Sequence, residues 1–456
     1  MTPVAAFDRS GVELSPTESE PPDLERSPID LLDARRQVAD LAERALAPFR
    51  CRCCGEPLSR LVADLGMQPL SNAFPSADQA LATEPFHPLR ALVCDACGLV
   101  QTQQVESADH IFTSDYPYFS STSAPWLEHA RRYADASIER FGLDASSRVV
   151  EVASNDGYLL RWFRERGIPS LGIEPTAGTA LAAEALGIEV VQAFFGAQLA
   201  RRLREQGVVA DLMPANNVVA HVPDLLDFVE GFRILLAPRG VATFEFHHLL
   251  NLLNHRQFDT IYHEHFYYHS LTTFMRILAS RGLAVFDVEE LPTHGGSLRV
   301  YAQPAATGRH PRSVRVIELL AREHDAGLLE PATWRSFDDA CRRMKRGMLS
   351  FLIDAKNEGR SIAACGAAAK GNTLLNYGGV RTDFIDYVVD DTPSKQGRLL
   401  PGTHIPVVGA GRLAETRPDY LVILPWNWRD EFVRRFADIR DWGGRFVVLT
   451  PQVEVF

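Results

Sequence analysis

The densest group of chemically versatile side chains in this 456-residue sequence lies between Phe258 and Ser270. It contains the run Tyr262-His263-Glu264-His265, and six histidines fall in or near it, at positions 247, 248, 255, 263, 265 and 269. Histidine titrates close to neutral pH and is also a common metal ligand. The residues alone leave three interpretations open: a metal site, a set of histidines with ordinary structural hydrogen bonds, or an acid–base centre.

Two Cys-x2-Cys pairs form a second group, Cys51 with Cys54 and Cys94 with Cys97, each pair followed by glycine. Zn²⁺ takes four soft ligands in a tetrahedron, and this spacing lets two thiolates converge on one ion. Four thiolates leave no open coordination position, so we predict a structural Zn²⁺ site. The alternative, four unrelated buried thiols, requires the same spacing twice by chance. Cys53 does not fit the Cys-x2-Cys spacing and is not expected to bind the metal.

A nucleotide-binding turn is indicated by the run Arg148–Gly157, which reads as a strand, a tight turn and a helix start. Small residues at 153–157 let the backbone approach a ligand closely, and several of them tolerate positive φ. The next strand ends in Glu174, where a carboxylate can accept hydrogen bonds from both ribose hydroxyls. That carboxylate would repel a 2′-phosphate, which disfavours NADP and leaves NAD open on these residues alone.

Secondary-structure elements must hold these polar groups in position. In this sequence, apolar strand-like runs alternate with helical patterns in two series. The first series comprises Arg148–Val152, Ser170–Ile173, Val209–Met213 and Val241–Phe246. The second comprises Ser361–Cys365, Phe384–Val389, His404–Val408, Tyr420–Leu424 and Arg445–Thr450. We predict two tandem α/β units, each a parallel sheet with helices on both faces, joined by a helical stretch from about Ser313 to Lys356.

Composition narrows the class of protein. The net charge is −11, which disfavours a general affinity for nucleic-acid backbones. No apolar run approaches the roughly 20 residues of a membrane span, and the N-terminus lacks the basic-then-apolar order of a secretory signal. We therefore expect a cytoplasmic protein. Residues 1–27 are expected to be disordered, and Ser27–Pro48 to form an amphipathic helix.

Two glycine-containing stretches in the second half could also approach a ligand. His294-Gly-Gly-Ser297 suits a ligand-facing loop or a plain hairpin turn equally well. Lys370-Gly-Asn-Thr373 follows a strand and begins a helix, but it lacks the full phosphate-loop pattern, so ATP hydrolysis is not expected. Its amides and Lys370 could still hold a diphosphate. Cys365 is expected in the core rather than as a nucleophile.

From about Cys51 to the C-terminus, these motifs resemble the S-adenosylmethionine-dependent sugar C-methyltransferases, class I enzymes of deoxysugar and antibiotic biosynthesis. Glu151-Val-Ala-Ser-Asn-Asp-Gly157 is similar to their first motif, with Ala153 where glycine is common. Tyr262-His-Glu-His265 is similar to their catalytic signature. The resemblance implies a zinc-binding domain over 49–110, a Rossmann-like methyltransferase domain over 111–290 and a second Rossmann-like α/β domain over 291–456, after a leader and helix over 1–48.

The resemblance also implies the roles of individual residues. The cofactor S-adenosyl-L-methionine would contact Glu151, Ala153, Ser154, Asn155, Gly157, Glu174, Ala193, Phe194, Asn216 and Asn217. His265 would be the general base, and its active-site partners would be Glu264, Tyr262, His221 and Tyr116. Cys51, Cys54, Cys94 and Cys97 would hold the zinc. These matches favour the acid–base interpretation of the histidine-rich segment.

The implied reaction is C-methylation of a dTDP-linked 4-keto-deoxysugar, most commonly at C-3. Carbon has no lone pair, so the C–H next to the ketone must lose its proton before it attacks a sulfonium methyl, and histidine suits that task. Tyr262, Tyr116 or His221 could donate to the enolate oxygen. The alternatives are transfer to oxygen, nitrogen or a non-sugar ketone, and a non-catalytic zinc-bearing binding protein. The exact sugar and the oligomeric state stay open, and a monomer is compatible with the sequence.

Overall fold

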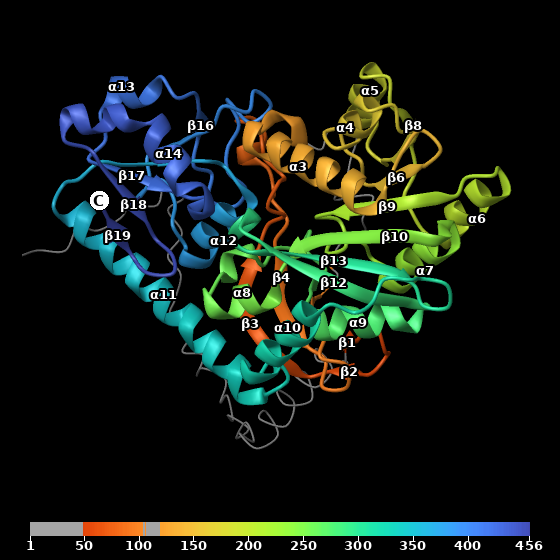
Figure 1. The fold of residues 1–456 in the computed structure, drawn as a ribbon. Helices are drawn as coiled ribbons and strands as arrows, with labels where there is room; N and C mark the ends of the chain where they lie inside the picture. The colour runs from red at the N-terminus through yellow and green to blue at the C-terminus, as the bar shows by residue number, and fades with distance from the viewer. Residues whose placement is uncertain (1–48, 104, 106–118) are drawn as a thin grey trace, which may run out of the picture. The chain divides into compact units, whose positions relative to one another are not determined.

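The computed structural model describes residues 49–103, 105 and 119–456. The predicted leader and helix within residues 1–48 lie outside this range, as does Tyr116. The described residues carry three main β-sheets, of four, seven and six strands, together with a two-stranded ribbon. Helices separate most of the strands in the second and third sheets (Figure 1). Among the described residues, no helix combines the length and the apolar character that membrane crossing requires.

The seven-stranded sheet includes β6, the strand that precedes the predicted nucleotide-binding turn, and has the order β12-β13-β10-β9-β6-β7-β8. Its strands are β6 (Val149–Val152), β7 (Ser170–Ile173), β8 (Glu189–Val191), β9 (Ala210–Asn216), β10 (Leu236–His247), β12 (Leu283–Leu291) and β13 (Ser297–Pro304). Its helices are α3 (Ala124–Phe141), α4 (Leu160–Glu165), α5 (Ala177–Ala185), α6 (Ala197–Glu205), α7 (Leu225–Leu235), α8 (Leu249–Asn254) and α9 (Leu271–Ser280). The chain runs outward from β6 on one side and returns to β9 on the other, so β6 lies at the switch point where such sheets bind ligands.

Side chains on both faces of the seven-stranded sheet are buried, which is why helices cover both faces. All four residues of β6 are buried, with Val150 and Val152 in one hydrophobic cluster and Val149 in another. The four strands predicted here are confirmed. The sheet is not wholly parallel, because β13 pairs antiparallel with both β10 and β12. It also continues past residue 290, where the sequence placed the end of this domain.

The six-stranded sheet has the order β16-β15-β14-β17-β18-β19 and is parallel except for β19. Its strands are β14 (Ile362–Cys365), β15 (Val388–Val389), β16 (Val407–Val408), β17 (Tyr420–Ile423), β18 (Arg445–Val448) and β19 (Glu454–Val455). The helices of this half are α10 (Val314–Asp325), α11 (Pro331–Asn357), α12 (Ala369–Gly378), α13 (Arg412–Thr416) and α14 (Arg429–Arg435). The second α/β unit is therefore confirmed, and Cys365 is a fully buried core residue.

The antiparallel four-stranded sheet combines segments that lie far apart in sequence. Its order is β11-β5-β4-β3, with β3 (Arg60–Gln68), β4 (His87–Val93), β5 (Val100–Thr102) and β11 (Tyr267–Tyr268); the ribbon is β1 (Phe49–Arg50) and β2 (Pro57–Leu58). The strand β11 directly follows the Tyr262–His265 run and pairs with β5. The N-terminal sheet thus holds one end of the histidine-rich segment.

Candidate active site

The turn that follows β6 has the backbone conformation expected of a close ligand approach. Ala153, Asn155 and Gly157 have φ values of 59°, 48° and 78°. The backbone N–H of Ala153 donates to the carbonyl of Ile173 over 2.8 Å, which ties the turn to the end of β7. A side chain at Gly157 would meet Ile188 at 2.4 Å. Glycine is therefore required at position 157, whereas Ala153 adopts a conformation that glycine adopts more easily.

Two buried acids flank this turn and differ in their hydrogen bonds. Among the described residues, neither carboxylate oxygen of Glu151 has a hydrogen-bond partner. Burial raises the pKa of Glu151 well above its usual value, and the nearby Tyr158 hydroxyl opposes this only in part. Glu174 instead accepts the backbone N–H groups of Asn155 and Thr176, each over 2.9 Å. Glu174 is thus oriented toward the turn as a carboxylate acceptor.

The remaining predicted cofactor residues lie at the same edge of the sheet. Ala193 and Phe194 follow β8, and the Phe194 side chain is 49% exposed. Asn216 ends β9, and its side-chain oxygen is buried without a hydrogen-bond partner among the described residues. Asn217 has a φ of 53° and donates its backbone N–H to the carbonyl of Glu245 over 2.7 Å. Carboxyl ends of parallel strands share one edge, so the structure gathers all of these positions there.

His265 has a defined tautomer. Its Nδ1 lies 3.0 Å from the backbone carbonyl of Thr260, and because a carbonyl can only accept, Nδ1 carries the proton. In the neutral ring Nε2 is therefore an acceptor, and the Tyr262 hydroxyl donates to it over 2.7 Å. Burial, together with the rings of His221 and His247, lowers the pKa of His265 well below its usual value. The ring is neutral at neutral pH, with its lone pair on Nε2.

His221 lies beside His265. The two ring centroids are 4.8 Å apart, and His221 donates from Nδ1 to the backbone carbonyl of Glu264 over 2.8 Å. Burial lowers the pKa of His221 to about 4. The sequence-predicted residues His221, Tyr262 and His265 therefore converge, while the predicted partner Tyr116 lies outside the described residues.

The side chain of Glu264 has a different partner. It is buried and accepts both contacts from the Asn72 amide, at 2.7 and 2.8 Å. The two nitrogens of His265 are occupied by Thr260 and Tyr262, so the Thr260 carbonyl, rather than Glu264, sets the orientation of the ring. Asn72 precedes β4 in the N-terminal sheet, and no pattern in the sequence linked it to this site.

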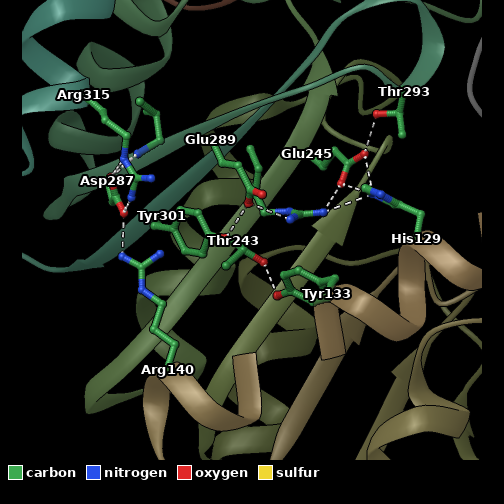
Figure 2. A network of polar contacts seen from close by, with 12 residues as sticks. His129, Tyr133, Arg140, Thr243, Glu245, Asp287, Glu289, Thr293, Tyr301 and Arg315 are labelled. Atoms are coloured by element: carbon green, nitrogen blue, oxygen red, sulfur yellow. Dashed lines mark hydrogen bonds and ion pairs between the residues drawn. The ribbon is translucent and has the colours of Figure 1, made fainter. Parts of the chain in front are cut away.

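A buried ionic network at the end of β10 was also not anticipated. Glu245 accepts from Arg299 at 2.6 Å, contacts His129 at 2.9 Å and accepts from the Thr293 hydroxyl at 3.1 Å. Figure 2 shows His129 and Thr293 converging on this carboxylate. Burial alone would raise the pKa of Glu245, but Arg299 and His129 outweigh it and hold the pKa at about 2. The network fixes α3 and β13 against β10, next to Asn217.

The four predicted cysteine ligands form one cluster. Their Sγ atoms all lie within 4.8 Å of one another, with Cys51 and Cys97 at 3.6 Å and Cys54 and Cys94 at 3.5 Å. Thiolates that share a tetrahedral ion at a metal–sulfur distance near 2.3 Å lie about 3.8 Å apart. The glycine after each pair donates its N–H back to the first cysteine carbonyl over 2.8 Å, so the two knuckles have the same geometry. The all-sulfur donor set suits a soft tetrahedral metal.

Arg52 connects this cluster to the histidine-rich segment. Its guanidinium donates to the backbone carbonyls of Thr102 and Phe266, and it lies over the rings of Phe266 and Tyr267 at 5.3 and 5.0 Å. The Thr102 hydroxyl donates to the His265 carbonyl over 2.8 Å. The first cysteine knuckle and the histidine-rich segment are therefore parts of one contact network.

Three family models match successive parts of the chain. The model described as "Putative zinc binding domain" matches residues 51–112, "Methyltransferase domain" matches residues 126–288, and "C-methyltransferase C-terminal domain" matches residues 292–451. Combined with the ligand-binding edge at β6, these matches define the class of protein as an S-adenosylmethionine-dependent methyltransferase.

C-methyltransferase NovU from Streptomyces niveus is 34% identical over 405 residues, which cover 89% of this chain and 96% of that protein. The chain belongs to the C-methyltransferase family that includes NovU. The family predicted from the sequence motifs is thereby confirmed, as is the enzyme class, an S-adenosylmethionine-dependent C-methyltransferase.

Solved structures show more distant likenesses. A possible histamine N-methyltransferase from Thermotoga maritima is 15% identical with a TM-score of 0.33, covering 43% of this chain and 100% of that one. Magnesium protoporphyrin IX methyltransferase from Synechocystis is 12% identical with a TM-score of 0.32, covering 44% and 99%. Both TM-scores are below 0.5, so the family assignment rests on NovU and the family models.

Proposed function

We propose that this C-methyltransferase methylates a dTDP-linked 4-keto-deoxysugar at C-3, in deoxysugar or antibiotic biosynthesis. The observation that carries the proposal is the tautomer of His265. Its proton is on the nitrogen that faces the Thr260 carbonyl, which leaves a neutral, half-buried Nε2 as an acceptor near the cofactor edge. Methyl transfer to oxygen or nitrogen needs less help from a base, whereas transfer to carbon requires one.

The cofactor site in this proposal consists of the ten residues predicted from the sequence. Its support is their shared position at the carboxyl edge of β6 to β9 and the positive φ angles of the turn. Glu174 uses one backbone donor on each carboxylate oxygen, which leaves further lone pairs for ribose hydroxyls. The exposed Phe194 ring offers a face on which adenine can stack.

When bound, the cofactor supplies a methyl group on positively charged sulfur. In the proposed reaction, His265 Nε2 accepts the C-3 proton, and the C–H electron pair becomes an enolate whose charge rests on the C-4 oxygen. C-3 then forms the new C–C bond while the methyl–sulfur bond breaks, with its electron pair kept by sulfur. Because the Tyr262 hydroxyl occupies Nε2 in the structure, the substrate C–H must take its place. The released hydroxyl can then donate to the ketone oxygen.

We also propose that Zn²⁺ occupies the cluster of Cys51, Cys54, Cys94 and Cys97. Four thiolates complete a tetrahedron and leave no position for substrate, so the metal's role is structural. Its contribution to activity would be indirect, through the contacts of Arg52. Metal analysis of the purified protein should find one zinc per chain, and a metal-free protein with full activity would contradict this assignment.

The test of the reaction combines labelled S-adenosylmethionine with a panel of dTDP-4-keto-6-deoxysugars. In D₂O, we expect exchange of the C-3 proton, followed by label in a new C–C bond detected by NMR. Label on oxygen or nitrogen of the acceptors would point to a different acceptor class. Absence of cofactor binding would point to a non-catalytic zinc-bearing binding protein.

A further inference from the structure

Lys370 places a cation between the C-terminal sheet and the histidine-rich segment. It lies in the first turn of α12, after the carboxyl end of β14. Its Nζ donates to the side-chain oxygen of Asn427 over 2.8 Å and lies 4.8 Å from the Trp426 ring centroid. In the described part of the chain, no carboxylate oxygen is within ion-pair distance of this Nζ. An ammonium has three N–H groups, so two remain for a ligand.

Several contacts fix this part of the C-terminal domain against the segment that carries the base. The Thr373 hydroxyl of α12 donates to the Ile261 carbonyl over 3.1 Å. The Trp426 indole donates to the Asp259 carboxylate over 2.6 Å. The same indole packs so closely on Gly295 that a side chain there would meet it at 2.4 Å. The position of Lys370 relative to Tyr262–His265 is therefore set by direct packing.

The ammonium is near enough to three imidazoles to affect their protonation. Burial, together with the charge of Lys370, lowers the pKa of His247 to about 3 and that of His294 to about 4. The same two causes act on His265, with the neighbouring histidines. Burial raises the pKa of Asp259 and lowers the pKa of Lys370, while the attraction between these two groups opposes both shifts. Lys370 thus lies among three imidazoles whose lowered pKa values favour their neutral forms, with Asp259 as the nearby acid.

Polar atoms without partners surround this cation. Nδ1 of His247, Nε2 of His294 and Oδ1 of Asp259 are all buried, and none has a hydrogen bond within the described residues. Buried polar atoms are nearly always paired in native proteins, with protein, water or ligand. Three such atoms beside an ammonium with two unused N–H groups mark a site for a polar ligand.

We propose that Lys370 is a catalytic residue that pairs with the enolate oxygen of the acceptor. This inference rests on the proposed function. As His265 takes the proton from C-3, negative charge develops on the C-4 oxygen, and an ammonium with no carboxylate partner stabilises that charge most. Such help is needed because a weakly basic imidazole removes a carbon-bound proton only when the ketone is strongly polarised.

The other anion that a nucleotide-sugar carries is its diphosphate. That group is attached at C-1, across the pyranose ring from C-4. Lys370 is on α12, whose Thr373 hydroxyl donates to the carbonyl of Ile261, directly before the Tyr262 that contacts His265. This closeness to the proposed base suits the C-3 and C-4 side of the ring. The diphosphate alternative makes a different kinetic prediction, and the experiment below separates the two.

The experiment compares full-length Lys370→Met and Lys370→Arg with the control variant Lys356→Met. Lys356 lies near the end of α11, and its Nζ forms an ion pair with Asp386 at 3.4 Å. Three quantities are measured: C-3 deuterium exchange with S-adenosylhomocysteine bound, kcat and KM for methyl transfer, and Kd for S-adenosylhomocysteine. For Lys370→Met we expect exchange and kcat to fall about 100- to 1,000-fold, with KM and Kd changed less than about threefold. Lys370→Arg should recover at least about tenfold of the loss, and Lys356→Met should behave as wild type.

A KM increase of about tenfold with normal exchange at saturation would assign Lys370 to the diphosphate and overturn the proposal. Normal values throughout would overturn it too. If Lys370→Met does not fold, Asn427→Ala serves instead, because it removes only the hydrogen-bond acceptor that holds the Lys370 Nζ. This variant should slow C-3 exchange about tenfold at unchanged KM. Unchanged exchange would contradict the proposal. If the wild-type enzyme exchanges no C-3 proton with any sugar of the panel, the proposed function itself is wrong. Results that differ from expectation only in the Lys370 variants would instead contradict the role of Lys370 alone.

Discussion

The Tyr262 hydroxyl lies 2.7 Å from Nε2 of His265, and their ring centroids are 4.0 Å apart. On the other side of the imidazole, the Thr260 carbonyl accepts the Nδ1 proton. The His265 ring, the proposed base, is thus oriented by its own short segment, without a carboxylate. The hydroxyl and the acceptor C–H must compete for the same lone pair.

Replacing Tyr262 by phenylalanine should leave S-adenosylhomocysteine binding unchanged and lower kcat/KM about 100-fold, because the ketone oxygen loses a donor. Methyl transfer to the dTDP-4-keto-sugar measures the effect. Tyr420→Phe is the control, since that hydroxyl meets Arg445 in the C-terminal domain. Turnover of Tyr262→Phe within about twofold of wild type would remove Tyr262 from the reaction.

His265→Asn should bind S-adenosylhomocysteine with nearly normal affinity, measured by calorimetry, while turnover falls about 10²- to 10⁴-fold. C-3 exchange should fall with it, because the amide cannot take the proton. The exposed His255→Asn serves as the matched control. Full exchange in His265→Asn would mean that another group is the base.

The buried histidines predict loss of stability in acid. Burial lowers the pKa of His221, His263, His269 and His294 to about 4 and that of His247 to about 3. Their unfolded values lie near 6.5, so the unfolded chain binds more protons as the pH falls from 6.5 toward 4. The contribution of these neutral rings to the free energy of unfolding is therefore complete above pH 6.5. Below pH 6.5 each ring loses on the order of 1 kcal/mol of this contribution for every unit by which the pH falls.

Glu151 offsets part of this loss, since its raised pKa means that protonation in acid favours the folded state. Urea unfolding at pH 7.5, 6.5 and 5.5 should still show a net fall of several kcal/mol, on the order of 2–4, between the first and last values. A free energy of unfolding that is flat over this range would show that the rings are solvated.

Arg52→Ala should retain the metal and yet lower kcat about tenfold, because the contacts that hold Phe266 and Tyr267 beside the base are lost. Metal content, melting temperature and kcat are measured together. Arg50→Ala is the matched control, since Arg50 is exposed and its guanidinium donates to Gly55 within the same knuckle. Equal kcat values for the two variants would separate the metal site from catalysis.

Ala153→Gly should raise the free energy of unfolding by about 0.5–1 kcal/mol, because relief of the left-handed conformation at φ 59° exceeds the added entropy of the unfolded chain. Ala368→Gly is the control: Ala368 has a φ of −94°, so glycine should bring no gain there. Urea unfolding without cofactor makes the comparison. A less stable Ala153→Gly protein would mean that the methyl group's packing outweighs its strain.

Local patterns predicted the parallel strands because strands buried on both faces are mostly apolar, as in Ile362–Cys365 and, apart from Glu151, in Val149–Val152. The thiol cluster was predictable because its ligands come in closely spaced pairs. The antiparallel strands β12 and β13 and the pairing of β11 with β5 were not predicted, since each depends on partners that a local window does not contain.

In the candidate site too, contacts between residues close in sequence were predicted, and contacts between distant residues were not. Tyr262 and His265 are three residues apart and were predicted as a pair, and the structure brings them together. Asn72 meets Glu264 across 192 residues of sequence, and the Trp426–Asp259 bond spans 167. No spacing rule reveals such contacts, and the role of Tyr116 stays a prediction.

The pairing of β11 with β5 sets the order in which a newly made chain can mature. The Thr102 hydroxyl and the His265 carbonyl that it binds are 163 residues apart in sequence. During translation, β5 therefore emerges from the ribosome long before its neighbour and presents an open edge to other nascent chains. The same late docking step that covers this edge also fixes the backbone of His265, so the proposed base reaches its place only when the edge is protected from aggregation.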